Sequence, residues 1–470
     1  MAELGGILGE IVRRKRIDAA ARFGAAALSD LRGRATRSRR SLAAALARPG
    51  ARFVMEVKKA SPSAGALRPS VDTSAQALAY RDVADAISVL TDGPYFGGSL
   101  ADIAAVRAVF DGPILAKDFV IDPCQVVEAR LYGADAVLVM LSVLDDRDAA
   151  EMLAEARGLG MEVVVEVHDA TELARAAALG APIIGINNRD LRTLEVDLAT
   201  TERLASLAPP GRLVLAESGI RAREDVLRLA PCADGFLVGS ALMRSDRPAA
   251  AARGLAFGRV KICGLTDPAD VDAAIRAGAT HAGFVMVAGT SRAVSRAAAE
   301  PLAEAARGKG VATVGVFRDH EAREVDAAAR GLMLDAVQLH GSEDGDYARG
   351  LRGLLPDRCE IWAARPVGSK VPPPRSGADR FLFDTDVGGR SGGTGQMFDW
   401  SKLRGRSELA ASLLAGGLRP DNARAAARVG AWALDVGSGV EAAPGRKDPA
   451  RMAAFFAALR PDARAELAQC

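Results

Sequence analysis

The sequence has few of the residues that usually mark a metal or cofactor site. Its 470 residues include only four histidines, without clustered ligands, and no dinucleotide-binding fingerprint. We therefore expect no metal and no nucleotide cofactor. The five cysteines are an odd number, and no two have the spacing of a zinc site or a redox motif. A reducing cytoplasm suits such a set better than secretion does.

A charge excess and a long apolar run are also missing. The 61 basic and 59 acidic side chains leave a formal net charge of +2, whereas a nucleic-acid-binding protein usually carries a strong basic excess. No stretch of about 18 uncharged apolar residues could span a membrane, and the segment from Met1 to Arg16 lacks the features of a signal peptide. We expect a cytoplasmic protein with no nucleic-acid or membrane partner.

What the sequence does contain is a regular alternation of short β-branched runs with longer helical patterns. Short buried strands separated by helices predict parallel βα units, and eight in succession favour a closed (β/α)8 barrel (TIM barrel) over an open sheet. The strands expected in the first half are Phe53–Lys58, Ala86–Leu90, Ile114–Lys117, Ala136–Met140, Met161–Val167, Ile183–Asn187, Leu213–Glu217 and Gly235–Val238.

The same pattern restarts at Val260 and predicts a second α/β barrel in tandem with the first. A length of 470 residues suits two domains of about 200–250 residues each. We expect one domain over 1–255, in which 1–50 form an extension of one or two helices, and another over 256–470. Its expected strands are Val260–Cys263, His281–Val285, Ala312–Val316, Ala336–Leu339, Glu360–Ala363, Arg380–Phe383, Ser412–Leu414 and Ala433–Asp435.

Two glycine-containing segments near the end of each half resemble one another. LAESGIR at 215–221 is similar to LAGGLR at 414–419, and VGS follows in both halves. Gly219 and Gly239 are 20 positions apart, as are Gly417 and Gly437. Loops after the last two strands of such a barrel commonly bind phosphate, because glycine lets backbone N–H groups approach the anion. Glycines that merely end strands are the alternative, and the repetition in register argues against it.

Charged or amide side chains end five separate strands of the first half. Glu56 and Lys58 alternate onto one face of the first strand, so both are expected to point into the barrel. Catalytic residues of such barrels lie at these carboxyl ends, although a self-neutralising charge network is the alternative. The other strand-end residues are Lys117, Glu166, Asn187, and Glu217 with Ser218.

Six strings in order carry a family likeness: MEVKKASPS, SVLTDGPYFGGS, LAKDFVIDPCQV, INNRDL, LAESGI and VGSALM. Over about residues 5–245 the chain resembles indole-3-glycerol-phosphate synthase. The resemblance implies closure of a carboxyphenylamino-deoxyribulose phosphate to an indole, with loss of carbon dioxide and water. Ala64 departs from the family pattern, in which a lysine is common.

The resemblance also assigns roles to the strand-end residues. Lys117 matches the acid that protonates the ketone, and Lys58 matches the cation beside the substrate carboxylate. Glu166 and Glu56 resemble the carboxylates that move protons and stabilise positive charge, without a decision on which serves which step. Positioned proton transfer typically contributes about 10²–10⁴-fold. The other implied contacts are Asn187, Ser218, Phe119, Arg189 and Glu217 and, for the phosphate, Ser61, Gly219, Gly239 and Ser240.

The second half has its own candidates at strand ends. Cys263 ends the first strand in VKICGLT, Arg292 follows the second, and Asp384 ends the sixth in FLFDT. Gln338 and His340 end the fourth strand in VQLHG. Plainer alternatives exist, because a strand cysteine is usually part of the core, His340 could be structural, and Asp384 could cap a turn.

Further strings make residues 259–460 resemble phosphoribosylanthranilate isomerase: KICGL, GFVMVAGTSRAVS, VQLHG, FLFDT, GGTG, FDW, LAGGL, LDVGSGVE and PGRKD. The resemblance implies an Amadori rearrangement that opens an aminoribose to a 1-amino-ketose. Cys263 matches the base for the C2 proton, Asp384 the acid for the ring oxygen, and Arg292 the contact to the anthranilate carboxylate. The other implied contacts are Gln338, His340 and, for the phosphate, Gly393, Thr394, Gly395, Gly417, Gly437 and Ser438.

The ordinary pKa of the base suits the reaction, whereas that of the acid does not. A thiol with a pKa of about 8.5 suits a base near neutrality. A protonated Asp384 at pH 7 requires its pKa to rise by roughly three units from about 3.9, or about 4 kcal/mol. Two departures accompany them: Ser291 stands where the family often has a proline before Arg292, and Gly437 replaces a serine of the phosphate loop.

The two implied reactions are consecutive in tryptophan biosynthesis, since the isomerase product is the synthase substrate. The expected partners are therefore small phosphorylated substrates. Other phosphate-binding barrels, such as sugar-phosphate epimerases or histidine-pathway isomerases, are the enzyme alternative. A second barrel that only stabilises or docks is the non-enzyme alternative. We expect a monomer, because two barrels in one chain already supply an intramolecular interface.

Overall fold

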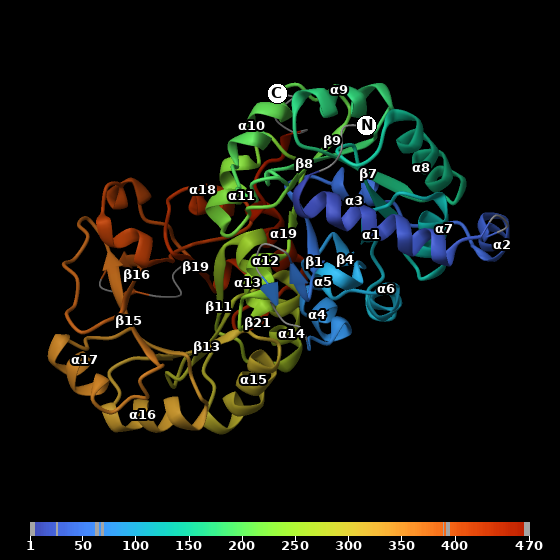
Figure 1. Cartoon of the computed structure of the whole chain (residues 1–470). Helices are drawn as coiled ribbons and strands as arrows, with labels where there is room; N and C mark the ends of the chain where they lie inside the picture. Colours follow the sequence, from blue (N-terminus) through green and yellow to red (C-terminus); the bar gives the residue numbers. More distant parts are fainter. Residues whose placement is uncertain are drawn as a thin grey trace. The chain divides into compact units, whose positions relative to one another are not determined.

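Eight parallel strands close into a barrel in each half of the chain, which confirms the predicted tandem architecture (Figure 1). The computed structural model describes residues 5–24, 27–61, 65–66, 70–388, 390–391 and 395–464. Residues 1–256 and 461–470 form one unit, and residues 257–460 form another. Within the described ranges, no helix is long and apolar enough to cross a membrane.

The first barrel closes in the order β1-β10-β9-β8-β7-β6-β5-β4, with every neighbouring pair parallel. Its strands are almost wholly buried, as expected for a parallel sheet covered on both faces. The predicted strands agree with them to within one residue at each end. They are β1 (Arg52–Val57), β4 (Ala86–Leu90), β5 (Ile114–Lys117), β6 (Ala136–Met140), β7 (Glu162–Val167), β8 (Ile183–Asn187), β9 (Leu213–Glu217) and β10 (Gly235–Val238).

Several helices that follow these strands begin at an aspartate whose side chain accepts from a free backbone N–H. Asp145 accepts from Asp148 N and Asp169 from Glu172 N, each at 2.9 Å. Such caps satisfy donors that the helix itself leaves unpaired. The helices are α4 (Thr73–Tyr80), α5 (Gly93–Phe96), α6 (Leu100–Arg107), α7 (Pro123–Leu131), α8 (Asp146–Gly158), α9 (Ala170–Ala178), α10 (Ala199–Ala205), α11 (Arg223–Leu229), α12 (Ser240–Met243) and α13 (Pro248–Phe257).

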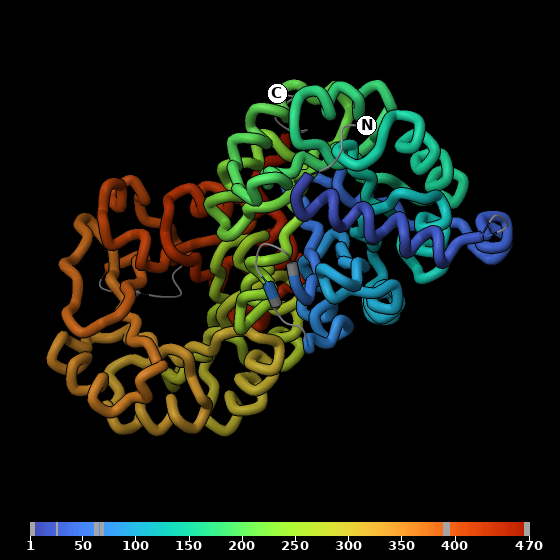
Figure 2. The backbone as a smooth tube through the Cα atoms, viewed as in Figure 1, coloured from blue at the N-terminus to red at the C-terminus, as the bar shows by residue number. Residues whose placement is uncertain are grey.

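The N-terminal extension is helical, as the sequence predicts, but it forms three helices rather than one or two. Lys15 fixes the first of them to the carboxyl ends of β4 and β5, where its Nζ lies 3.1 Å from Asp92 and 2.6 Å from Asp118. In Figure 2 this helix is the dark blue coil near the start of the chain. The helices are α1 (Gly6–Arg22), α2 (Ala27–Arg34) and α3 (Leu42–Leu46).

The described end of the chain returns to the first barrel. The carbonyl of Pro461 accepts from Ala51 N at 2.8 Å, just before β1. Arg464 donates to the carbonyl of Arg212 at 3.0 Å and lies 3.9 Å from the buried Asp234 carboxylate. Residues 461–464 therefore pack beside the amino ends of β1, β9 and β10.

The second barrel closes in the order β11-β12-β13-β14-β15-β16-β18-β19, and β19 pairs back with β11. The short β17 (Arg390–Ser391) extends β16 in antiparallel fashion. The barrel strands are β11 (Arg259–Cys263), β12 (His281–Val285), β13 (Ala312–Phe317), β14 (Ala336–Leu339), β15 (Glu360–Val367), β16 (Arg380–Val387), β18 (Leu413–Leu414) and β19 (Ala433–Val436). The helices are α14 (Pro268–Ala277), α15 (Arg296–Gly308), α16 (Ala322–Gly331), α17 (Gly345–Arg352), α18 (Ala423–Ala427) and α19 (Pro449–Leu459).

The alternation of strands and helices breaks between β15 and β16. Each of these strands runs four residues beyond its predicted end, and residues 368–379, all of them described, contain no helix. Pro372, Pro373 and Pro374 lie in this connection and lack the backbone N–H that a helix interior needs. The expected α-helix is therefore absent at this crossover, and the only helices formed by the described residues between β16 and β18 are likewise two short 3-10 helices, at Trp400–Leu403 and Ser407–Ala411.

Candidate active sites

A cavity of about 830 Å³ lies at the carboxyl ends of the first barrel's strands. Ser61 ends β2 (Ala60–Ser61), but its side chain lies outside the described residues, as does Ala64. The structure brings the other residues singled out from the first half to this cavity: Glu56, Lys58, Lys117, Phe119, Glu166, Asn187, Arg189, Glu217, Ser218, Gly219, Gly239 and Ser240.

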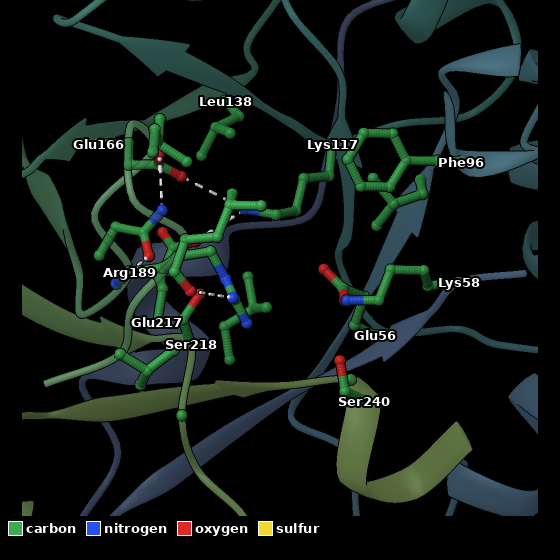
Figure 3. Close-up of a pocket in the computed structure, with 18 of the residues that line it drawn as sticks. Glu56, Lys58, Phe96, Lys117, Leu138, Glu166, Arg189, Glu217, Ser218 and Ser240 are labelled. Carbon is green, nitrogen blue, oxygen red and sulfur yellow. Dashed lines mark hydrogen bonds and ion pairs between the residues drawn. The ribbon is translucent and has the colours of Figure 1, made fainter. Parts of the chain in front are cut away.

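Lys117 is the centre of a buried charge network in this cavity. Its Nζ lies 2.8 Å from Glu217 Oε2 and 3.4 Å from Glu166 Oε2. Figure 3 shows the lysine reaching from β5 toward both carboxylates, with Glu56 and Lys58 nearby. Burial alone would lower the pKa of Lys117, but Glu217, Glu166 and Glu56 outweigh it and raise the pKa above its usual value. The lysine is therefore an ammonium ion in the resting site.

The pKa values of the two carboxyl groups that flank Lys117 are shifted in opposite directions. Burial raises the pKa of Glu217 to about 7, with Lys117 opposing the rise and Glu166 adding to it. Burial also acts to raise the pKa of Glu166, but Lys117, His168 and Asn187 lower it below its usual value. When two titratable neighbours are shifted apart in this way, one is suited to act as an acid and the other as a base.

Two glycines make room for the carboxylates. A Cβ atom at position 239 would lie 2.1 Å from Glu56 Oε1, and one at position 185 would lie 2.3 Å from Glu217 Oε1. Lys58 Nζ pairs with Glu56 Oε1 at 2.5 Å. Because glycine has no side chain, Gly239 leaves room for the Glu56 carboxylate. This is in addition to any contact that its backbone makes with a ligand.

The loops after β8 and β9 hold the remaining polar groups in fixed positions. Asn187 Nδ2 donates to Glu166 Oε1 at 3.1 Å, and its Oδ1 accepts from Arg189 N at 3.0 Å. Ser218 has a φ of 63° and is followed by Gly219 with a φ of 85°. A left-handed serine is uncommon and strained backbone gathers at functional sites.

The second barrel holds a cavity of about 170 Å³ at the same ends of its strands. Cys263 and Asp384 both line it, so the predicted base and acid face one space. Gly393 and Thr394 lie outside the described residues. The other residues singled out from the second half that line this cavity are Arg292, Gln338, His340, Gly395, Gly417, Gly437 and Ser438.

Cys263 lies near a buried ion pair that the sequence analysis did not predict. Lys261 Nζ lies 3.0 Å from both carboxylate oxygens of Asp435, and the lysine side chain is fully buried. Burial raises the pKa of the Cys263 thiol, while Lys261 opposes the rise and Asp435 adds to it. The Cys263 thiol is therefore a weaker acid than an unperturbed thiol, and it is neutral in the resting site near pH 7.

The predicted acid of the second barrel is contacted by a histidine. His340 Nε2 lies 3.4 Å from Asp384 Oδ2, and His340 Nδ1 lies 3.0 Å from Gln338 Nε2. Asp384 Oδ1 also accepts from Thr385 N at 2.8 Å. The Asp384 side chain is thus fixed at one oxygen by backbone and faces His340 with the other.

Arg292 is held at the rim of this cavity by a carboxylate. Its Nε and Nη2 donate to the two oxygens of Glu441 at 2.8 and 2.7 Å. Glu441 also accepts from the buried Lys447 at 2.8 Å, and Lys447 donates to the Gly437 carbonyl at 3.1 Å. The three side chains together carry one net positive charge, so the rim still favours an anion.

Among the described residues, no group of three or more His, Cys, Asp or Glu side chains is arranged to hold a metal ion. What both cavities offer is paired acids, bases and cations beside glycine loops. Such a set can transfer protons on a bound anion without further groups.

Two family models match the chain in succession. Indole-3-glycerol phosphate synthase matches residues 8–255, and N-(5'-phosphoribosyl)anthranilate (PRA) isomerase matches residues 260–458. The chain belongs to these two families, fused. It is a bifunctional enzyme of tryptophan biosynthesis, with a synthase (lyase) barrel followed by an isomerase barrel.

Relatives with the same fusion are similar along nearly the whole chain. The tryptophan biosynthesis protein TrpCF of Yersinia pestis is 45% identical, covering 97% of this chain and 94% of that protein. That of Vibrio parahaemolyticus is 43% identical, covering 98% and 95%. Among solved structures, phosphoribosyl anthranilate isomerase from Thermus thermophilus is 33% identical, covering 43% of this chain and 98% of that one, with a TM-score of 0.37.

The sequence analysis missed three residues at or behind the synthase cavity: Arg221, Arg244 and His168. Arg221 and Arg244 line the cavity beside Arg189. Within the described part of the chain, no carboxylate pairs with any of these three arginines. Burial and then the charges of Arg221 and Arg244 lower the pKa of Arg189. His168 contacts Glu166 from behind. The signal for His168 was its place two residues after Glu166, directly after the end of β7.

In the isomerase barrel, Lys261 and Asp435 escaped for a different reason. Lys261 is two residues before Cys263 and Asp435 two before Gly437, so alternation along each strand places them one layer deeper in the barrel. That spacing could have identified both. Their ion pair across β11 and β19 could not be read from either strand alone.

Proposed function

We propose that the isomerase barrel converts N-(5-phosphoribosyl)anthranilate to 1-(2-carboxyphenylamino)-1-deoxyribulose 5-phosphate, and that the synthase barrel turns this product into indole-3-glycerol phosphate. One observation carries the proposal. In each barrel, a candidate proton donor, a candidate proton acceptor and glycine loops of the kind that bind phosphate line the same cavity. The partners are thus small phosphorylated molecules.

In the synthase barrel, Lys117 donates the proton to the ketone oxygen as the ring closes. Lys58 holds the carboxylate that leaves as carbon dioxide. Glu217, with a pKa of about 7, protonates the hydroxyl that leaves as water. Glu166 stays ionised and accepts the proton whose loss completes the aromatic ring. Glu56 stabilises the positive charge that develops on the ring nitrogen as water departs.

In the isomerase barrel, Cys263 removes the C2 proton and Asp384 protonates the ring oxygen. The burial that raises the pKa of the thiol makes Cys263 a strong base once it is deprotonated. Lys261 is the adjacent cation that favours the thiolate. Arg292, held by Glu441, binds the anthranilate carboxylate through the part of its guanidinium that the pair leaves free.

Each substrate phosphate is bound by the paired glycine loops. In the synthase barrel these are the loops at Gly219 and at Gly239 with Ser240, and Asn187, Ser218, Phe119 and Arg189 orient the rest of the substrate. In the isomerase barrel they are the loops at Gly417 and at Gly437 with Ser438, joined by Gly395. Gln338 and His340 complete the isomerase site.

The organisation of the chain follows the same division. We place the synthase domain in residues 1–255 and the isomerase domain in residues 256–470, with residues 461–464 packed on the synthase barrel. The enzyme acts as a monomer in the cytoplasm. Elution of the purified chain at the size of one 48.8 kDa molecule is expected on a calibrated sizing column with light scattering.

Incubation of the full-length chain with phosphoribosylanthranilate tests both activities at once. We expect transient accumulation of the ketose phosphate followed by indole-glycerol phosphate. Asp384→Asn should block the first product while leaving turnover of added ketose phosphate intact. If wild-type protein converted the ketose phosphate but never phosphoribosylanthranilate, the isomerase assignment would fall and the docking alternative would stand.

A further inference from the structure

The imidazole of His168 lies between two carboxylates behind the synthase cavity. His168 follows β7 and is not among the residues that line the cavity. Its Nδ1 lies 3.0 Å from Glu172 Oε2, and its Nε2 lies 3.3 Å from Glu166 Oε1. The exposed fraction of the His168 side chain is 16%, against 2% for Glu166.

Both ring nitrogens of His168 therefore face acceptors. An ionised carboxylate can only accept hydrogen bonds, so a nitrogen that faces one needs a proton of its own. A neutral imidazole carries one such proton and an imidazolium carries two. Nδ1 is at hydrogen-bond distance from Glu172, and Nε2 lies at ion-pair distance from Glu166 without the alignment of a hydrogen bond, so the positive charge of an imidazolium suits the two carboxylates better than a neutral ring does.

We propose that His168 is a positioning residue of the synthase: its imidazolium, anchored by Glu172, keeps Glu166 ionised and in place beside Lys117. The inference deepens the proposed function, since it rests on Glu166 acting as a carboxylate. His168 does not touch the substrate and acts through Glu166.

The anchor on Glu172 is independent of the catalytic carboxylate. Glu172 Oε2 accepts from the backbone N–H of His168 at 2.8 Å as well as facing its ring. Glu172 itself stands in the first turn of α9, whose N-cap is Asp169. The backbone N–H and the ring of His168 thus contact one oxygen of a residue in the first helical turn, which fixes the direction in which Nε2 points.

The polar and charged groups around Glu166 come from four other elements, and His168 directly follows the strand that carries Glu166. Glu166 is on β7, Lys117 on β5, Asn187 on β8 and Glu217 on β9, with Glu172 behind on α9. Burial would lower the pKa of His168, but hydrogen bonds and charge from Glu166 and Glu172 raise it to about 10. Near neutral pH, Lys117 and His168 are thus two cations that share the Glu166 carboxylate.

The test replaces His168 by glutamine in the full-length chain. A glutamine amide can still donate toward Glu166 but carries no charge, so the pKa of Glu166 should rise toward its usual range. We expect synthase kcat/KM in H168Q to stay within about threefold of wild type at pH 7 and to fall at least fivefold between pH 6 and pH 3.5, because a carboxylate with an ordinary pKa of about 4.3 is mostly protonated at the lower pH. Wild type should fall far less over that interval.

Matched variants separate charge from structure. Glu172→Gln removes the carboxylate that anchors His168. The fall of synthase kcat/KM at low pH should then shift in the same direction as in H168Q, but by a smaller amount. Glu151→Gln, an exposed glutamate on α8, should leave the profile unchanged. Isomerase activity of the same preparations should match wild type. A loss in H168Q that is equal at every pH would mean a merely structural role and would overturn the proposal.

A direct measurement keeps the inference apart from the proposed function. In protein labelled with ¹³C at histidine Cε1, the His168 signal should remain that of an imidazolium from pH 6 to pH 9. A His168 that titrates near 6.5 would overturn the inference even if the synthase is active. If the His168 signal is that of an imidazolium but the protein makes no indole product, the proposed function is contradicted and the inference about His168 is not.

Discussion

Lys117 Nζ lies 2.8 Å from Oε2 of Glu217, so the tips of β5 and β9 meet in one buried ion pair. The other Glu217 oxygen is buried and has no hydrogen-bond partner among the described residues. A half-satisfied carboxyl with a pKa of about 7 can hold a proton at neutral pH. This relationship gives the first prediction.

Synthase kcat/KM should fall as pH rises through about 7, because a group that must donate its proton is active below its pKa and inactive above it. Glu217→Gln cannot donate and should lower the rate by about 10²–10³-fold. The ionisation near pH 7 should vanish from the residual activity. Initial rates of indole-glycerol phosphate formation between pH 5 and 9 provide the check, and a residual profile that keeps this ionisation contradicts it.

Lys117→Ala should abolish indole-glycerol phosphate formation, at a cost of about 10²–10⁴-fold or more for a lost acid. The isomerase barrel should keep its rate in the same protein, which serves as the control for folding. The ketose phosphate should then accumulate from phosphoribosylanthranilate. Continued indole production by this variant would remove Lys117 from the acid role.

Isomerase kcat/KM should still be rising between pH 7 and pH 9, because burial raises the pKa of the Cys263 thiol above its usual value and the base form appears only as that pKa is approached. Cys263→Ser should reduce the rate by about 10²–10⁴-fold and remove this rise. Rates of ketose phosphate formation across that range test both statements. A serine variant with near wild-type rates would exclude Cys263 as the base.

Replacing Arg221 and Arg244 together by glutamine should raise the KM for the ketose phosphate by about three- to tenfold, since each partly exposed charge pair contributes roughly 0.2–1 kcal/mol. The value of kcat should change little, and the dependence of KM on salt should weaken. Arg228→Gln is the control, because that arginine is already paired with Glu202. Equal salt dependence in wild type and double variant would argue against a phosphate contact.

Gly437→Ser should lower the isomerase KM. A Cβ atom at position 437 would make only ordinary contacts of 3.7 and 4.0 Å with Cys263, so the loop has room for a serine side chain. The added hydroxyl can donate to the phosphate, and a net hydrogen bond contributes about 0.5–1.5 kcal/mol, or about two- to tenfold. Steady-state kinetics with phosphoribosylanthranilate measure it, and an unchanged or higher KM would show that the loop does not use a hydroxyl here.

The strands of both barrels were predictable because each is a short apolar run between helical patterns. The crossover from β15 to β16 was not, since Pro372–Pro374 remove the helix and the strands lengthen instead. The strand-end residues were equally predictable, from Glu56 to Asp384. Their acidities were not: Glu217 and Glu166 are both strand-end glutamates, and only their neighbours in space drive the two pKa values apart.

The sequence by itself determined the two barrels, the order of the motifs and the families to which the chain belongs. These depend on local periodicity and on residue types at fixed spacing, which are properties of the chain. Tertiary structure alone decided which of the two glutamates beside Lys117 is held ionised, why the pKa of the Cys263 thiol is raised, and that His168 faces two carboxylates. Those properties come from burial and charge–charge distance between residues far apart in sequence, and no one-dimensional pattern encodes them.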